Sequence, residues 1–269
     1  MKTALLLLAV VALAAAAVAE EPAKKPPKES DSAKKARSML AAADRLAFRP
    51  LADGLKDLSL EFEVVTLQGK LRGLWLYRAA TKKLPARSKK TVKNVADRRR
   101  RRLLVTGILR PFRLITDPVL RRPFADLAAD MDLDWNAEKR EVRMKVKKGL
   151  TKPPTHTRIV VALNAAGLPD RVSWFFPEVD PEDPMEGTYE IERSSSFTWS
   201  KVEGKHVVTM LNTNRTGSRL IAKYTYAKVK GILLPKQVDQ IDPLGGMEKI
   251  PLERIKVNEG ISDEEFARW

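Results

Sequence analysis

The chain has 269 residues, of which 31% are charged, and a formal net charge of +16. It contains no cysteine and only two histidines, His156 and His206, which excludes disulfides and thiol nucleophiles and leaves few options for a zinc site. The positive charge is concentrated, because residues 82–122 hold fifteen Lys and Arg against Asp97 and Asp117. The rest of the chain is close to neutral.

The N-terminal residues 1–19 have the pattern of a secretory signal peptide. Lys2 precedes an apolar stretch that is shorter than the about 20 strongly apolar residues of a membrane-spanning helix. Ala17-Val18-Ala19 is a small-x-small cleavage site. Residues 20–37 are rich in Pro, Lys and Glu and lack large apolar side chains, which predicts a solvated, disordered linker. We therefore expect export to the periplasm and a single folded domain over residues 38–269.

The folded part is predicted to begin with a helix and two strands. Residues 38–51 place apolar side chains at helical spacing. From Leu58 to Val64 apolar and polar residues alternate, as in a half-buried strand, and residues 70–80 return as a second strand after Gln68-Gly69. Residues 82–129 are predicted to be a basic helical insertion.

A hairpin is predicted over residues 130–147, with its turn at Asn136 to Lys139. This register pairs apolar with apolar and acidic with basic residues. The predicted pairs are Leu133 with Val142, Met131 with Met144, Asp132 with Arg143, and Asp130 with Lys145. Because basic residues face these aspartates, we expect a solvated charged face there and no metal site.

The second half of the chain is predicted to be a meander of strands. Apolar runs are separated by short turns that contain Gly, Asn or Pro, which favours antiparallel pairing. The predicted strands are residues 156–164, 170–177, 188–200, 205–213, 218–230, 232–242 and 247–257. With the earlier four they make about eleven strands. The sequence thus predicts an α+β fold in which a large curved antiparallel sheet carries helices on one face.

Catalytic motifs are absent from the sequence. There is no phosphate-binding loop, dinucleotide fingerprint, zinc motif or Gly-x-Ser-x-Gly nucleophile, so we expect no enzymatic activity and no cofactor. The strands instead offer large apolar side chains that could build the core or line a cavity between sheet and helices. The candidate cavity residues are Leu60, Phe62, Val64, Leu74, Leu76, Val172, Trp174, Phe176, Tyr224 and Tyr226.

Three segments resemble the outer-membrane lipoprotein carrier (LolA-type) superfamily. They are "NAAGLPDRVSWFF" (164–176), "GILLP" (231–235) and "VNEGISDEEF" (257–266). The resemblance implies an unclosed half-barrel of about eleven strands with helices over its concave opening. It also implies a periplasmic carrier that binds lipid or lipoprotein acyl chains, for lipoprotein sorting or a related envelope lipid task. It transfers no binding residue to a position of this chain.

The basic run leaves the partner open. A short basic helix could pack its apolar side on the sheet opening and turn its arginines toward an anionic membrane surface or an acidic protein partner. The same run is compatible with a merely solvated helix face. The patch residues are Arg98, Arg99, Arg100, Arg101, Arg102, Arg110 and Arg113.

Two function classes follow: a lipid carrier, or an envelope scaffold or sensor module that binds a protein through the basic insertion. Nucleic acid is not expected as a partner, because no DNA- or RNA-reading module surrounds the arginines and the chain is predicted to leave the cytoplasm. We expect a monomer.

Overall fold

The computed structural model describes residues 29–66, 69–81, 85–95, 97–121, 123–151, 154–179, 188–215, 218–241 and 246–268. The predicted signal peptide and residues 20–28 of the predicted linker lie outside the described residues, and so does the side chain of Arg98. Within the described part of the chain, no helix is long and apolar enough to cross a membrane.

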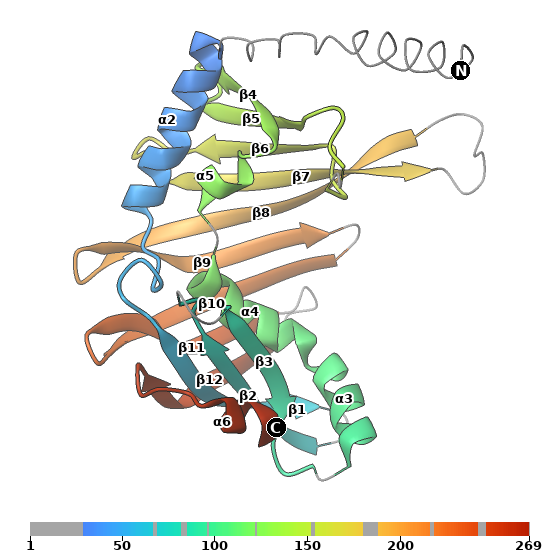
Figure 1. Cartoon of the computed structure of the whole chain (residues 1–269), viewed down its shortest axis with the longest axis vertical. Coiled ribbons are helices and arrows are strands. Elements are labelled where there is room, and N and C mark those ends of the chain that lie inside the picture. Colours follow the sequence, from blue (N-terminus) through green and yellow to red (C-terminus); the bar gives the residue numbers. More distant parts are fainter. Residues whose placement is uncertain are drawn as a thin grey trace, which may run out of the picture. The chain divides into compact units, whose positions relative to one another are not determined.

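In the described part of the chain, a twelve-stranded antiparallel sheet dominates the fold (Figure 1), and its two edge strands do not pair with each other. The strand order is β3-β2-β1-β12-β11-β10-β9-β8-β7-β6-β5-β4. The strands are β1 (Asp57–Thr66), β2 (Gly69–Arg78), β3 (Arg87–Val92), β4 (Met131–Asn136), β5 (Glu141–Val146), β6 (Arg158–Leu163), β7 (Pro169–Val179), β8 (Thr188–Val202), β9 (Lys205–Arg215), β10 (Ser218–Val229), β11 (Ile232–Ile241) and β12 (Met247–Val257). The predicted open antiparallel sheet is confirmed.

The twelfth strand, β3, was not predicted, because it lies in the segment expected to be a helical insertion. Its sequence, RSKKTV, is too basic to read as a half-buried strand. β3 lies at an edge of the sheet, and edge strands commonly carry lysine, which discourages pairing with other chains. The prediction of helix from residue 82 is therefore wrong for β3.

Helices α2, α4 and α5 pack on one face of the sheet, and α6 packs on the opposite face of β2 (Figure 1). The helices are α2 (Asp31–Leu46), α3 (Arg98–Gly107), α4 (Leu109–Leu120), α5 (Phe124–Leu127) and α6 (Asp263–Arg268). α2 starts within the predicted linker, seven residues before the predicted helix. Its first turns are buried through Ala33 and Ala36, and alanine both favours helix and allows close packing. The sequence prediction assigned these residues to the linker because they include no large apolar side chain, and small alanines make the contact instead.

Two core clusters hold α2, α4 and α5 against one face of the sheet. One joins α4 to strands β1, β2 and β9 to β12, with Phe112 and Ile115 fully buried. The other joins α2 and α5 to strands β4 to β7, with Leu40 and Phe124 among its members. Phe197 of β8 is partly buried and packs against both clusters. The region around Phe197 is therefore where the two clusters meet.

The β4–β5 hairpin differs from the prediction by two residues in register. The observed pairs include Leu133 with Met144, Asp132 with Lys145 and Asp134 with Arg143. The Asn136 Oδ1 accepts a 3.0 Å hydrogen bond from the backbone N–H of Lys139, and Arg140 has φ 52°. This Asn-capped turn over residues 137–140 displaces the register. A shift by two keeps every side chain on its predicted face, so the acidic residues still face basic ones.

Side-chain hydrogen bonds join the segment after β12 to the backbone at the start of β1. The Asn258 Oδ1 accepts hydrogen bonds from the backbone N–H groups of Lys56 (2.7 Å) and Asp57 (3.2 Å), and its Nδ2 donates to Gly54 O (2.9 Å). The Asp57 carboxylate in turn accepts from the backbone of Glu259 and Gly260. Part of the "VNEGISDEEF" segment therefore has a structural role.

Candidate ligand-binding cavity

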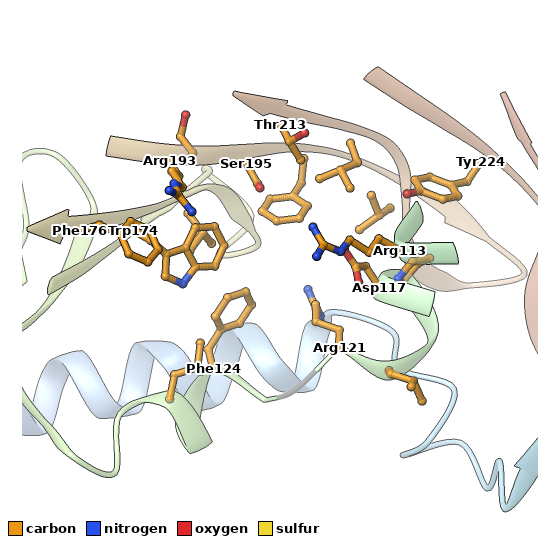
Figure 2. Close-up of a pocket in the computed structure, with 18 residues that line it drawn as sticks. Arg113, Asp117, Arg121, Phe124, Trp174, Phe176, Arg193, Ser195, Thr213 and Tyr224 are labelled. Atoms are coloured by element: carbon orange, nitrogen blue, oxygen red, sulfur yellow. The ribbon is translucent and has the colours of Figure 1, made fainter. Parts of the chain in front are cut away.

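A cavity of about 610 Å³ lies between α4, α5 and strands β7 to β10, on the helix-covered face of the sheet (Figure 2). This volume is within the about 300–1,000 Å³ of typical small-molecule sites. Most of its wall is apolar and aromatic. It is lined by Arg113, Asp117, Pro118, Leu120, Arg121, Phe124, Leu127, Val172, Trp174, Phe176, Arg193, Ser194, Ser195, Phe197, Val208, Leu211, Thr213 and Tyr224.

Small side chains in the sheet leave space for the cavity. Ser195 of β8 pairs with Val172 of β7 on one side and with Thr213 of β9 on the other. These three short side chains lie between the large residues of the two core clusters. Because helix and sheet are held apart by those clusters, short side chains between them leave volume unfilled.

The helical wall is fixed by buried apolar side chains and one hydrogen bond. α4 buries Phe112, Ile115 and Val119, so the rest of the helix presents its polar side to the cavity and to solvent. The Tyr224 Oη donates a 3.1 Å hydrogen bond to the Leu114 carbonyl across this packing. Burial raises the pKa of Tyr224 well above its ordinary value, which keeps the phenol protonated as a donor.

The sheet wall is mainly aromatic. Val172, Trp174 and Phe176 alternate along β7 and all line the cavity, as strand geometry requires of residues on one face. The Arg193 guanidinium lies 4.5 Å from the Phe176 ring centroid. In Figure 2, Trp174, Phe176 and Arg193 lie together on one side, while Arg113, Asp117 and Tyr224 lie on the other.

Arg121 is the most buried charge of the cavity wall. Burial lowers its pKa to about 10, although nearby Asp44 opposes the shift, so the guanidinium remains charged at neutral pH. Its Nη1 and Nη2 are buried and have no hydrogen-bond partner among the described residues. Two aromatic rings lie beside it, because its Cζ lies 5.1 Å from the Phe124 ring centroid and 5.2 Å from that of Trp199.

The structure brings some of the sequence-predicted cavity residues together and separates others. Val172, Trp174, Phe176 and Tyr224 line the cavity. Tyr226 lies on the same strand as Tyr224, and its Oη donates to Val208 O at 2.9 Å. Neither Tyr226 nor the five predicted residues on β1 and β2 line the cavity. Leu60, Phe62 and Val64 belong to the core under α4, and Leu74 and Leu76 pack with Ile261 and Phe266 of the C-terminal segment.

The split within β2 follows from strand geometry. Trp75 and Tyr77 belong to the core under α4, so Leu74 and Leu76 must point to the opposite face. There Phe266 of α6 covers them, flanked by the guanidinium groups of Arg78 and Arg87. The sequence prediction chose Leu74 and Leu76, which lie on the face of β2 that points away from α4.

Sequence reasoning missed the cavity residues of the helical wall and of β8. Arg121, Phe124 and Arg193 were not among the candidates, and Arg113 was considered only as part of a surface patch. The pattern around Arg121 contains no distinguishing signal, because it lies in a basic stretch where every arginine looks alike. Ser195, in the run Ser194-Ser195-Ser196, offered one signal: three small residues inside a long strand can mark a wide space.

The arginine run forms the exposed α3 helix, begun by the N-cap Asp97, whose side chain accepts from Arg100 N at 2.5 Å. Arg99, Arg100, Arg102 and Arg110 are exposed, whereas Arg101 donates to the Val95 carbonyl. Leu103, which lies between the exposed arginines, is 68% exposed. Arg113 lies apart from this group, because it lines the cavity.

Comparisons with known proteins give two weak structural similarities. A crystal structure of a DUF1329 family protein from Desulfovibrio piger matches with 13% identity and a TM-score of 0.36, over 88% of this chain and 98% of that chain. A LolA superfamily protein from Nitrosomonas europaea matches with 9% identity and a TM-score of 0.27, over the same shares. No protein-family model and no curated protein sequence matches the chain. At these scores neither match supports an inference about the site.

No group of three or more His, Cys, Asp or Glu residues in the described ranges is arranged to hold a metal ion. What the cavity offers is apolar area together with three arginines and one carboxylate, Asp117. Such a wall can bind an apolar chain and orient a polar end group.

Proposed function

We propose that this protein is an exported, non-catalytic carrier that holds an acyl chain in the cavity between α4, α5 and strands β7 to β10. The observation that carries this proposal is the cavity itself: about 610 Å³, walled mostly by apolar and aromatic side chains of both the sheet and the helices. Burying an acyl chain there removes its methylene groups from water, at roughly 0.8 kcal/mol for each.

Two further features support a carrier. The sequence carries no catalytic motif, and its N-terminal residues have the pattern of a signal peptide. The sequence also resembles lipoprotein carriers in three short segments. An acyl chain in transit through an aqueous compartment needs a wall of this kind, because its exposure to water is unfavourable.

The test uses a matched pair of substitutions on one strand. Ser195 lines the cavity, whereas its neighbour Ser196 is exposed on the other face of β8. Ser195→Trp should fill the cavity and Ser196→Trp should leave it open. We expect wild-type protein and Ser196→Trp to co-purify from cells with acyl chains, detected by native mass spectrometry and lipid extraction. Both proteins should also bind added decanol. Ser195→Trp should lose both properties; a wild-type protein that binds neither would refute the carrier.

A second candidate function concerns how such a carrier reaches its lipid. Leu103 is 68% exposed among the exposed Arg99, Arg100 and Arg102 of α3, and this helix continues directly into the cavity wall. An exposed leucine between cations favours an anionic membrane surface over a protein partner, since each cation there contributes about 1 kcal/mol and the leucine can enter the interface.

The membrane contact is tested with anionic and zwitterionic vesicles. Wild-type protein should sediment with anionic vesicles only, and the triple change of Arg99, Arg100 and Arg102 to Gln should abolish this while leaving decanol binding intact. Lys223, Lys249 and Lys256, changed together to Gln, are the control for net charge. If the arginine variant still sediments, α3 is only a solvated helix. If wild-type protein ignores vesicles but retains an acidic protein through these arginines, the scaffold alternative replaces this one.

A further inference from the structure

Arg121 differs from the other charged groups of the cavity because no described residue forms a hydrogen bond with its two Nη atoms. Its Nη1 and Nη2 atoms are buried and lack hydrogen-bond partners among the described residues. Its cation–π contacts with Phe124 and Trp199 place aromatic rings beside the guanidinium and give its Nη atoms no oxygen acceptor. A buried donor that makes no hydrogen bond is costly, and such groups need an explanation.

The neighbours of Arg121 supply one nearby negative charge but no hydrogen bond to its Nη atoms. The Asp44 carboxylate raises the pKa of Arg121; its Oδ2 accepts a 2.9 Å hydrogen bond from Ala125 N, and its Oδ1 is buried without a hydrogen-bond partner among the described residues. No described carboxylate forms an ion pair with Arg121 within 4 Å. Arg49, also nearby, adds a second positive charge, and its Nε is likewise buried without a partner among the described residues. This corner of the cavity is therefore positive.

The rest of the cavity wall has the same sign. Arg113 and Arg193 line the cavity with Arg121, against the single carboxylate of Asp117. Figure 2 shows Arg113 and Arg121 on the helical side, and Arg193 across the cavity on the sheet side. The rings of Trp174 and Phe124 lie between Arg193 and Arg121, and Phe176 lies beside Arg193. A ligand that complements this wall is apolar along most of its length and carries a negative charge that an arginine can bind.

We infer that the ligand is an amphiphile with an anionic head group, a carboxylate or a phosphate, and that the unsatisfied edge of Arg121 binds this head. The inference rests on the proposed function and names the class of its ligand. A guanidinium presents N–H donors in a planar fork that matches carboxylate and phosphate oxygens, and such charge-assisted hydrogen bonds are roughly twice as strong as neutral ones. Arg113 and Arg193 add to the field that attracts the head group.

The test compares amphiphiles that share one chain and differ only in the head: decanoate, decyl phosphate, neutral decanol and cationic decyltrimethylammonium. Binding to the full mature protein is measured by calorimetry below the micellar concentrations. We expect the better anion to bind about ten- to a hundredfold more tightly than decanol, which corresponds to one charge-assisted hydrogen bond. The cation should bind more weakly than decanol. The tighter of the two anions identifies the head group.

Arg121→Met keeps the apolar stem and removes the charge. It should remove the preference for the anion and leave the affinity for decanol within about twofold of wild type, because the apolar wall is retained. Arg121→Lys should keep part of the preference, since it retains the charge without the planar fork. Arg143→Met, an exposed change on β5 outside the cavity, should behave as wild type.

The possible results distinguish failure of the carrier function from failure of the anionic head group. Equal binding of decanoate, decyl phosphate and decanol to wild-type protein overturns the anionic head group while the carrier function stands. An anion preference that survives Arg121→Met overturns the role of Arg121. Failure of every amphiphile to bind refutes the carrier. If Arg121→Met does not fold, as circular dichroism will show, the head-group series on wild type and Arg121→Lys still decides.

Discussion

The Tyr224 hydroxyl donates a 3.1 Å hydrogen bond to the backbone carbonyl of Leu114, the residue four positions before Pro118. In an α-helix that carbonyl would accept from the N–H of residue 118, but proline has no N–H. Tyr224 of β10 therefore supplies the donor that Pro118 removes from α4. The same hydrogen bond ties the helical wall of the cavity to its sheet wall.

This relationship predicts a specific double-mutant cycle. Tyr224→Phe should lower the free energy of unfolding by about 1–2 kcal/mol, because it leaves the buried Leu114 carbonyl without a donor. Pro118→Ala restores the helical N–H, so in that background Tyr224→Phe should cost clearly less. Urea unfolding of the four proteins measures the coupling. Equal costs in both backgrounds would show that the tyrosine acts only through its packing.

Tyr226→Phe is the matched control for a measurement of how often α4 separates locally from the sheet. Its hydroxyl also donates to a backbone carbonyl, that of Val208, but this hydrogen bond joins two strands. Hydrogen exchange in α4 should accelerate in Tyr224→Phe and remain unchanged in Tyr226→Phe.

Arg121→Met should increase stability while it weakens binding of the anion. A buried charge without hydrogen-bond partners costs free energy, and apolar replacements of buried charges are often neutral or stabilising by about 1–4 kcal/mol. We expect a gain of about 1 kcal/mol, after loss of the contacts with Phe124 and Trp199. Arg193→Met, at an exposed position, should leave stability within about 0.5 kcal/mol. A loss of stability in Arg121→Met would mean that Arg121 is a structural residue.

Binding of decanoate should fall as the pH rises through about 10. Burial lowers the pKa of Arg121 to about 10, so below this pH the guanidinium is charged, and the affinity should be constant over the neutral range where the decanoate carboxyl is also ionised. Above it, the free protein loses the proton that the bound anion requires, and the affinity declines with each pH unit until the pKa of the complex is reached. Asp44 raises and Arg49 lowers the pKa of Arg121, and the pKa of Tyr226 is itself raised by burial. The other charges that face this space are Arg113, Asp117 and Arg193.

Decanol is the control for this profile, because its binding should not change over the same range if the protein remains folded. Arg121→Met should bind decanoate weakly and show no decline near pH 10. A decanoate profile of wild type that is flat to pH 11 would contradict the role of Arg121.

The sheet was predictable because its signal is local. Alternation from Leu58 to Val64 reports directly which residues a strand buries, and the structure buries those four apolar residues. The basic edge strand β3 and the alanine-based start of α2 were missed for the opposite reason. Their burial comes from partners distant in sequence, so their own composition does not reveal it.

The cavity was only half predictable. Trp174 and Phe176 predict an apolar face on β7. Nothing in the sequence distinguishes that face from the apolar face of β1, against which Phe112 of α4 packs through Phe62. Which face remains open depends on where the helices pack. Arg121 differs from the exposed arginines of α3 by its burial, and burial is a property of the tertiary structure.

Asn258→Ala should lower the free energy of unfolding by about 2–3 kcal/mol. It removes the side-chain hydrogen bonds to the backbone of Gly54, Lys56 and Asp57, and it places alanine at φ 53°, where asparagine is tolerated better. Asn258→Gly removes the hydrogen bonds but fits this backbone, so it should cost about 1 kcal/mol less. Thermal unfolding of both variants separates the two contributions. Equal costs would show that the hydrogen bonds act alone.

Gly73→Ala tests how tightly the core under α4 is packed. A Cβ at Gly73 would lie 2.6 Å from Cε1 of Phe62, whose ring is held edge-on against Phe112 at a centroid distance of 4.8 Å. The ring cannot retreat, so we expect a loss of about 1–3 kcal/mol from overpacking. In a Phe62→Leu background the same change should cost much less, because the ring atoms that clash are gone. Chemical unfolding of the four proteins gives the coupling free energy; additive costs would place the strain in the backbone of β2 and not in the Phe62 ring.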